Sequence, residues 1–195
     1  MLDMQKVTEL RNLTGAGIVD CKKALEENGG DVAKAAEALR KKGIVKAGGK
    51  AERQTKEGLV HAYIHSNNKV GAMVEIQCET DFVARTEQFK DFVHDVAMQV
   101  AASNPLYVGP EQVPAEVIEK EKELAMAEFD GSGKPHEMLM KIAEGKLSKY
   151  YSDVCLLKQT FVKDEDKTVE EVLKETIAKT GENIVIKRFV RFGME

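Results

Sequence analysis

The sequence TDFVAR, residues 80–85, places a carboxylate directly beside a large aromatic side chain. An apolar strand pattern ends before these residues and a helical pattern follows them, and such a junction can present side chains to a partner. Asp81 and Phe82 are the side chains that this junction would present. From periodicity alone the plainer interpretation is favoured, in which Phe82 is a core residue and Asp81 is a first-turn acid that complements the helix dipole.

Motifs for covalent catalysis such as GxxxxGK[ST], GxGxxG, HExxH and GxSxG do not occur in the sequence. His61 and His65 share one face of a predicted strand and could bind a metal, although a partly exposed strand face is the favoured interpretation. Cys78 and His65 could suggest a thiol nucleophile, but Cys78 continues an apolar alternation and is predicted to be an inert core thiol. We therefore predict no enzyme, no metal site and no cofactor.

The elements that flank residues 80–85 have different periods. Residues 70–78 alternate between apolar and other side chains, which predicts a strand with one buried face. Residues 59–65 predict its partner, and the turn residues 66–69 predict an antiparallel hairpin. On the other side, apolar residues recur at helical spacing over 89–102, with Thr80 as the predicted N-cap.

The remainder of the chain is predicted to contain several helices and one strand. Pro114 predicts a helix start, a Gly-Ser-Gly turn at 131–133 separates that helix from another beginning near Pro135, and residues 163–167 predict a charged turn. Thr168 is the predicted cap of a helix that Gly181 ends, and residues 183–192 predict a strand that joins the hairpin. The predicted class is α+β, with a small antiparallel sheet and several helices.

The N-terminal residues predict three short helices around a small core. Asp3 and Asp31 are candidate caps, tight turns fall at 14–17 and 28–30, and Gly43 is predicted to end the third helix. Such a unit lacks the volume to enclose a substrate and is typical of interaction modules.

Residues 40–56 contain seven basic residues against a single acidic one, Glu52, around the flexible stretch 47–49. A solvated linker is the favoured interpretation, because no aromatic side chains are interleaved and the whole chain carries a net charge of −4. The alternative that these basic residues lie near RNA or a phosphate group stays open. We predict a helical domain at 1–45, a basic flexible linker at 46–57 and an α+β core and dimerisation domain at 58–195.

Composition limits the compartment and the class of protein. The 195 residues are 43% hydrophobic, enough for a core without any stretch of about 20 apolar residues that would span a membrane. Cys21, Cys78 and Cys155 lie far apart, with no zinc spacing and no even-numbered disulfide framework. These features, with no signal-peptide pattern at the start, predict a cytoplasmic protein.

Two long blocks resemble the bacterial translation elongation factor Ts family. Residues 10–17 (LRNLTGAG) and 20–25 (DCKKAL) are similar to its N-terminal module, and residues 80–84 (TDFVA) are similar to its most distinctive core motif. The resemblance continues through residues 181–184 (GENI) and 188–189, so it covers essentially the whole chain. Longer relatives carry a second core half and a coiled-coil insertion, whereas this chain resembles the short form, in which two copies pair.

The resemblance implies a guanine-nucleotide exchange factor for elongation factor Tu. In the family mechanism, Phe82 would wedge between helices of the nucleotide-binding domain, and Asp81 would disturb the region that holds Mg²⁺, so that GDP leaves. Thr80 and Val83 would hold this pair in place. Direct binding of nucleic acid and membrane is not expected.

The N-terminal unit resembles a ubiquitin-associated-type bundle that docks on a separate helix of the same GTPase. The turn at 14–17 and the apolar pair after it are the implied contact, since two apolar residues after a tight turn are hard to bury in a small core. Residues 65–70, at the hairpin tip, are a weaker candidate for a second contact. The predicted docking residues are Thr14, Gly15, Ala16, Gly17, Ile18, Val19 and Lys22.

Two other functions remain as alternatives at this point. A non-catalytic scaffold built on the three-helix unit would leave Asp81 and Phe82 dispensable. An RNA-binding protein that uses residues 40–56 would bind RNA alone with a strong salt dependence.

Overall fold

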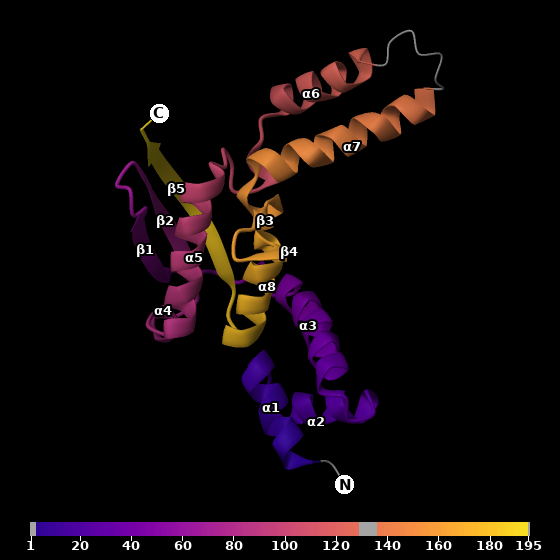
Figure 1. Ribbon diagram of the computed structural model, residues 1–195, viewed down its shortest axis with the longest axis vertical. Coiled ribbons are helices and arrows are strands. Elements are labelled where there is room, and N and C mark those ends of the chain that lie inside the picture. Colours follow the sequence, from indigo (N-terminus) through magenta and orange to yellow (C-terminus); the bar gives the residue numbers. More distant parts are fainter. Residues whose placement is uncertain (1–2, 129–135, 195) are drawn as a thin grey trace. The chain divides into compact units, whose positions relative to one another are not determined.

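A computed structural model describes residues 3–128 and 136–194 (Figure 1), and these confirm the α+β class. The chain divides into two compact units, each assembled from stretches that are distant in sequence. The first unit contains Met1–His61, Glu75–Asp95 and Glu171–Lys187. The second contains Ala62–Val74, Val96–Glu170 and Arg188–Glu195.

The three predicted N-terminal helices are present as α1 (Met4–Thr14), α2 (Ile18–Glu27) and α3 (Val32–Gly48). Both predicted caps are confirmed: Asp3 accepts a hydrogen bond from the Gln5 backbone N–H at 2.9 Å, and Asp31 accepts one from Lys34 at 3.1 Å. The small core consists of buried apolar side chains from all three helices. They are Val7, Leu10, Cys21, Ala24, Leu25 and Ala35.

Gly43 does not end the third helix, so that prediction was wrong. Helix α3 continues to Gly48. Glycine stands at position 43 for a packing reason, because a Cβ atom there would lie only 2.9 Å from the Cβ of Ala178. Ala178 belongs to α8 (Val169–Thr180), and the missing side chain lets the two helices approach closely. Ala47 is also buried, which favours continuation of the helix. The domain limits at 45 and 57 stay a prediction.

Several cations of the basic stretch have partners within the first unit. Arg40 forms an ion pair with Glu175 of α8, and the Lys50 ammonium donates to the Ile177 carbonyl at 3.5 Å. Arg53 lies 3.5 Å from the Glu79 carboxylate. The positive charge of this stretch is therefore partly compensated by the chain itself.

The predicted hairpin is formed by β1 (Glu57–Ile64) and β2 (Val70–Cys78), and β5 (Ile184–Gly193) completes a three-stranded sheet in the order β1-β2-β5. At the hairpin tip, Asn68 has a φ of 55°, as expected for a turn asparagine. The alternation along β2 is confirmed, since Val74, Ile76 and Cys78 are buried and Met73 is exposed.

Helix α5 (Glu87–Ser103) lies along one face of this sheet (Figure 1). His61 of β1 forms a hydrogen bond with His94 of α5, and the Arg191 Nε of β5 donates to the Ala101 carbonyl at 3.0 Å. The helix turns an apolar face inward. Its buried side chains are Phe89, Phe92, Val93, Val96, Ala97, Val100 and Ala101.

The second unit also contains a helical hairpin of α6 (Ala115–Ala127) and α7 (His136–Val154), which lie side by side (Figure 1). The predicted turn at 131–133 and the predicted start at Pro135 fall outside the described residues. Short 3-10 helices precede α6 and follow α7, at Pro110–Gln112 and Leu156–Lys158.

Residues 164–167 of the charged stretch belong to a strand, so the predicted turn was misplaced. Strand β3 (Thr160–Phe161) pairs with β4 (Asp164–Thr168), and the turn falls one residue earlier, at 162–163. Buried Gln99 of α5 fixes this turn by accepting from the Val162 N–H at 2.7 Å and donating to the Thr160 carbonyl at 3.1 Å. A tertiary contact of this kind leaves no trace in the local charge pattern.

Within residues 3–128 and 136–194, no helix is long and apolar enough to cross a membrane. The same part of the chain contains no group of three or more side chains arranged to hold a metal ion.

Candidate functional site

Residues 79–84, here called the wedge loop, follow β2 and contain a one-turn helix, α4 (Asp81–Ala84). Thr80 is the N-cap of α4, as predicted, and its hydroxyl accepts from the Val83 N–H at 3.4 Å. Thr86 then starts α5, because its hydroxyl accepts from the Phe89 N–H at 3.2 Å. The junction therefore holds two successive helix starts, where the sequence pattern predicted one.

Phe82 projects into solvent with 78% of its surface exposed, so its interpretation as a core residue was wrong. Ala84 is the buried residue of α4. Asp81 is half-buried, and its carboxylate lies 2.8 Å from the Arg85 guanidinium one turn later. A large aromatic side chain is thus presented next to a carboxylate on a short, capped helix.

The wedge loop is held by Glu182, a residue more than 100 positions later in the chain. One carboxylate oxygen accepts from the backbone N–H groups of Glu79 at 3.1 Å and Thr80 at 3.0 Å. The other accepts from the Thr80 hydroxyl at 2.6 Å. Three donors therefore converge on a single carboxylate at the base of α4.

Asn183, the next residue, holds the other side of the loop. Its backbone N–H donates to the Glu79 carboxylate at 2.6 Å, and its side-chain amide donates to the carbonyls of Ala51 at 3.3 Å and Arg53 at 2.8 Å. Asn183 is buried, so these bonds satisfy polar groups that would otherwise be costly to remove from water. The wedge loop and the segment before β1 are fixed by the same two consecutive residues.

Residues 14–19, here called the docking turn, join α1 to α2. Gly15 has a φ of 67°, a left-handed conformation that favours glycine, and its N–H donates to the Arg11 carbonyl at 2.8 Å. The Thr14 hydroxyl donates to the Leu10 carbonyl at 2.7 Å and accepts from the Ala16 N–H at 3.3 Å. The turn is therefore defined by bonds between near neighbours.

The docking turn exposes the apolar pair that follows it. Val19 is 80% exposed and Ile18 is 44% exposed, while Ala16 packs against the bundle core. Gly17 and Lys22 are exposed. The small core leaves no room for Ile18 and Val19, in agreement with the reasoning from the sequence.

The two motif regions match a known family. The model of the family described as elongation factor TS matches residues 5–195 of the chain. A protein named elongation factor Ts from Carboxydothermus hydrogenoformans is 55% identical over 194 residues, covering 100% of this chain and 89% of that protein. Proteins of the same name from Thermotoga petrophila and Thermoanaerobacter sp. are 54% and 53% identical, covering 98% of this chain and 95% and 94% of their own lengths.

The chain belongs to the elongation factor Ts family. Because the similarity runs through nearly the whole of these relatives, it is not confined to one shared module. The family resemblance of residues 10–25 and 80–84 is thereby confirmed.

Sequence reasoning in terms of the elongation factor Ts motif found the exposed side chains and missed what holds them. Glu182 lies in the segment GENI, which belongs to the family resemblance but which we predicted only as a helix end and a strand start. Its position directly after Gly181, which ends α8 with a φ of 79°, was the available signal. No local pattern indicates that its carboxylate returns to residues 79 and 80.

Cys78 and His65 do not form a nucleophilic pair. The Cys78 thiol is buried and donates to the Thr80 carbonyl at 3.2 Å, and its burial raises its pKa to about 11. His65 interacts with the Tyr63 hydroxyl at 3.1 Å. The core-thiol interpretation of Cys78 is therefore supported, and the thiol lies directly beneath the wedge loop.

His61 pairs with His94, with the Nε2 and Nδ1 atoms 3.1 Å apart. Burial of His61 and the neighbouring charge of His94 lower the pKa of His61. One of the two ring nitrogens must donate and the other must accept, so the bond requires at least one neutral ring. This pair joins β1 to α5, the helix that follows the wedge loop in the chain.

Proposed function

We propose that this protein is a guanine-nucleotide exchange factor that acts on elongation factor Tu during translation elongation. Membership of the elongation factor Ts family supports this function. The structural observation that carries the proposal is Phe82, which is exposed on a short helix that is itself firmly held. We expect the protein to carry out this function in the cytoplasm.

In the proposed mechanism Phe82 inserts between helices of the nucleotide-binding domain of the GTPase. Aromatic side chains are among the strongest anchors at protein interfaces, and a side chain that is already exposed needs no rearrangement before it inserts. Thr80 and Val83 keep α4 in the geometry that exposes Phe82 to the partner.

Asp81 enters the same region as a negative charge. A carboxylate near the Mg²⁺ site competes with the groups that hold the cation, and loss of Mg²⁺ weakens the contacts to the phosphates of GDP. Arg85 pairs with Asp81 in the free protein and keeps that charge partly compensated in solution. GDP then dissociates without covalent chemistry.

Exchange requires that the protein bind nucleotide-free elongation factor Tu more tightly than the GDP-bound form. A partner shifts an equilibrium only by its difference in affinity for the two states, and the linkage is reciprocal. Excess nucleotide then displaces the exchange factor, which is released for another cycle.

The docking turn supplies a second contact, on a separate helix of the same GTPase. Ile18 and Val19 offer the apolar surface, and the nearby Lys22 adds a cation. A contact that does not reach the nucleotide site holds both states of the GTPase, so it raises affinity without changing the rate of the bound complex.

Release of a fluorescent GDP analogue from elongation factor Tu tests the exchange function. The protein is added in catalytic amounts with excess unlabelled GDP, and release should accelerate through many turnovers. Absence of acceleration by the folded protein would contradict the proposal. RNA binding measured over a range of salt concentrations distinguishes the RNA-binding alternative, which would show tight binding without the GTPase.

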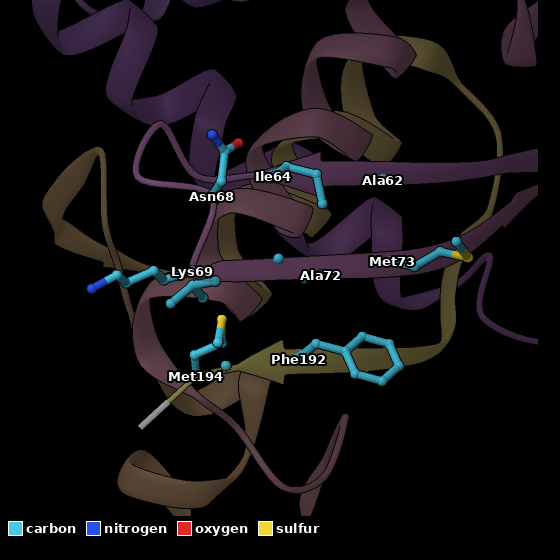
Figure 2. A pocket seen from close by; sticks show the side chains of 11 residues that line it. Ala62, Ile64, Asn68, Lys69, Ala72, Met73, Phe192 and Met194 are labelled. Atoms are coloured by element: carbon cyan, nitrogen blue, oxygen red, sulfur yellow. The ribbon is translucent and has the colours of Figure 1, made fainter.

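We also propose that two copies of the chain pair, as the family resemblance implies. On the sheet, Ile64, Met73 and Phe192 stay exposed on neighbouring strands and line a pocket of about 390 Å³ (Figure 2). Met194 also lines this pocket, and Val190 is exposed two residues before Phe192 on β5. A second copy is the occupant we expect, because the same patch on two chains can close on itself by twofold symmetry.

Molar mass in solution tests the pairing. The wild-type chain should have twice the monomer mass by light scattering, and Phe192→Asp should have the monomer mass, because it would bury an unpaired charge. Val162→Asp, at another exposed apolar position of the same unit, is the matched control and should leave the mass unchanged. A monomeric wild type would contradict the pairing.

A further inference from the structure

We infer that Glu182 is a positioning residue for nucleotide exchange, an inference that rests on the proposed function. Its carboxylate sets the direction of α4 and therefore of Phe82, although it touches neither Phe82 nor Asp81 through any hydrogen bond of the described structure. It acts through Thr80, and the chain of contacts can be followed atom by atom.

The first step is the set of three hydrogen bonds that the Glu182 carboxylate accepts. Its two oxygens accept from the Glu79 N–H, the Thr80 N–H and the Thr80 hydroxyl, at 3.1, 3.0 and 2.6 Å. Hydrogen bonds to an ionised group are shorter and stronger than neutral ones. Two consecutive backbone N–H groups are thereby held to one side chain, which fixes the peptide plane that enters α4.

The second step is the orientation of the Thr80 hydroxyl. A hydroxyl has one proton to donate, and Thr80 donates it to Glu182. Its lone pairs are then directed toward the Val83 N–H, which it caps at 3.4 Å. The carboxylate thus determines which way the cap faces, and the cap determines the geometry of a helix only one turn long.

The third step concerns the backbone that carries Glu182. It lies between Gly181, which ends α8, and Asn183, whose own bonds fix Glu79 and the carbonyls of Ala51 and Arg53. Asn183 is 2% exposed. The backbone that carries Glu182 is therefore immobilised, so its side chain acts from a fixed base.

The chemistry of the three donors predicts how substitutions rank. Glutamine keeps one oxygen for the two backbone N–H groups and turns its NH₂ toward Thr80, whose hydroxyl can accept, so most of the geometry survives. Aspartate keeps the charge but is one methylene too short to reach all three donors. Alanine leaves two backbone N–H groups without their partner.

The test is a concentration series of wild type, Glu182→Ala, Glu182→Asp and Glu182→Gln in the release of fluorescent GDP from elongation factor Tu. We expect Glu182→Ala to lower the maximal rate about tenfold or more, with the half-saturating concentration changed by less than about twofold, because the docking turn is intact. Glu182→Asp should be intermediate, and Glu182→Gln should retain most of the rate. Glu87→Ala, at an exposed glutamate that pairs with Lys90, is the matched control.

A second readout is independent of activity. Amide hydrogen exchange in Glu182→Ala should lose protection at residues 80 and 83–84 while the amides of α1–α3 keep theirs. If Glu182→Ala fails to fold, the Glu182→Gln and Glu182→Asp pair carries the test, since both are expected to fold and to differ in rate.

The failures of the two proposals are distinguishable. If wild type does not accelerate GDP release, the proposed function and this inference fall together. If wild type accelerates release and Phe82→Ala slows it, while Glu182→Ala matches wild type, the inference alone is overturned. Equal losses of rate in all three Glu182 variants, in proportion to their unfolded fraction, would also overturn it.

Discussion

Phe82 of the wedge loop and Val19 of the docking turn are exposed to about the same extent, but the two regions are held in different ways. Phe82 is 78% exposed and Val19 is 80% exposed. The docking turn is fixed by hydrogen bonds that span at most five positions of the chain. The wedge loop is fixed by bonds from residues more than 100 positions away. Exposure alone therefore does not indicate how precisely a side chain is directed.

This difference corresponds to two tasks. A docking surface tolerates small shifts, because apolar contact is not directional. A wedge that must enter one place in a nucleotide-binding domain loses effect if it is displaced by about 1 Å. We therefore expect substitutions at the docking turn to change affinity and substitutions at the wedge loop to change the rate of release.

The largest effect is expected for Phe82→Ala. Loss of a central aromatic anchor costs about 2 kcal/mol or more, which is roughly 30-fold in the maximal rate of GDP release. The free energy of unfolding should hardly change, because the side chain is exposed. Saturation kinetics with fluorescent GDP and urea denaturation measure the two quantities.

Leu106→Ala is the control for this substitution, since Leu106 is also a large exposed apolar residue. It should leave both the maximal rate and the stability unchanged. A Phe82→Ala variant that releases GDP at the wild-type rate would remove the wedge role and with it the contrast between the two regions.

Local signals predicted most of the three-helix bundle, including the docking turn. Asp3 and Asp31 as caps, and the turn at Gly15, follow from residue types that act on their immediate neighbours. The exposure of Val19 followed from the small volume of the bundle core. The fold class and the strands β1, β2 and β5 were predictable for the same reason, since alternation is a local property.

Long-range contacts explain what the sequence did not reveal. Gly43 is a typical helix terminator, yet it lies inside α3, where its missing side chain allows close packing against Ala178. The charged stretch 163–167 is typical of a turn, yet Gln99 places the turn earlier. Glu182 is the same case at the site itself, because its role depends on a contact with Thr80 that no period or spacing encodes.

A smaller effect is expected for Val19→Asp. An unpaired carboxylate at an apolar contact should raise the half-saturating concentration by on the order of tenfold and leave the maximal rate unchanged. Val45→Asp is the matched control, because Val45 is 78% exposed on α3 outside the docking turn. A lower maximal rate with unchanged half-saturation would mean that the docking turn takes part in release, which would break the comparison.

The smallest effect concerns the His61–His94 pair, which joins β1 to α5, and it depends on pH. The pKa of His61 is lowered from its ordinary value of 6.5 by burial and by His94, so the unfolded chain binds a proton more readily than the folded one. The stability that neutral His61 contributes is therefore present above about pH 6.5 and is lost as the pH falls through the folded-state pKa. The three-helix bundle contains no histidine and has no such dependence on this residue type.

We expect His61→Gln to reduce the loss of unfolding free energy between pH 7 and pH 5, measured by urea denaturation at both values. Glutamine stays neutral over this range and can still form a hydrogen bond to His94. His65→Gln, which removes an exposed histidine at the hairpin tip, should leave the pH dependence as in wild type. If His61→Gln loses as much stability as wild type, the acid sensitivity does not come from the β1–α5 pair. The β1–α5 pair would then add no acid sensitivity that the bundle lacks, and the wedge loop and the docking turn would differ only in how their exposed side chains are held.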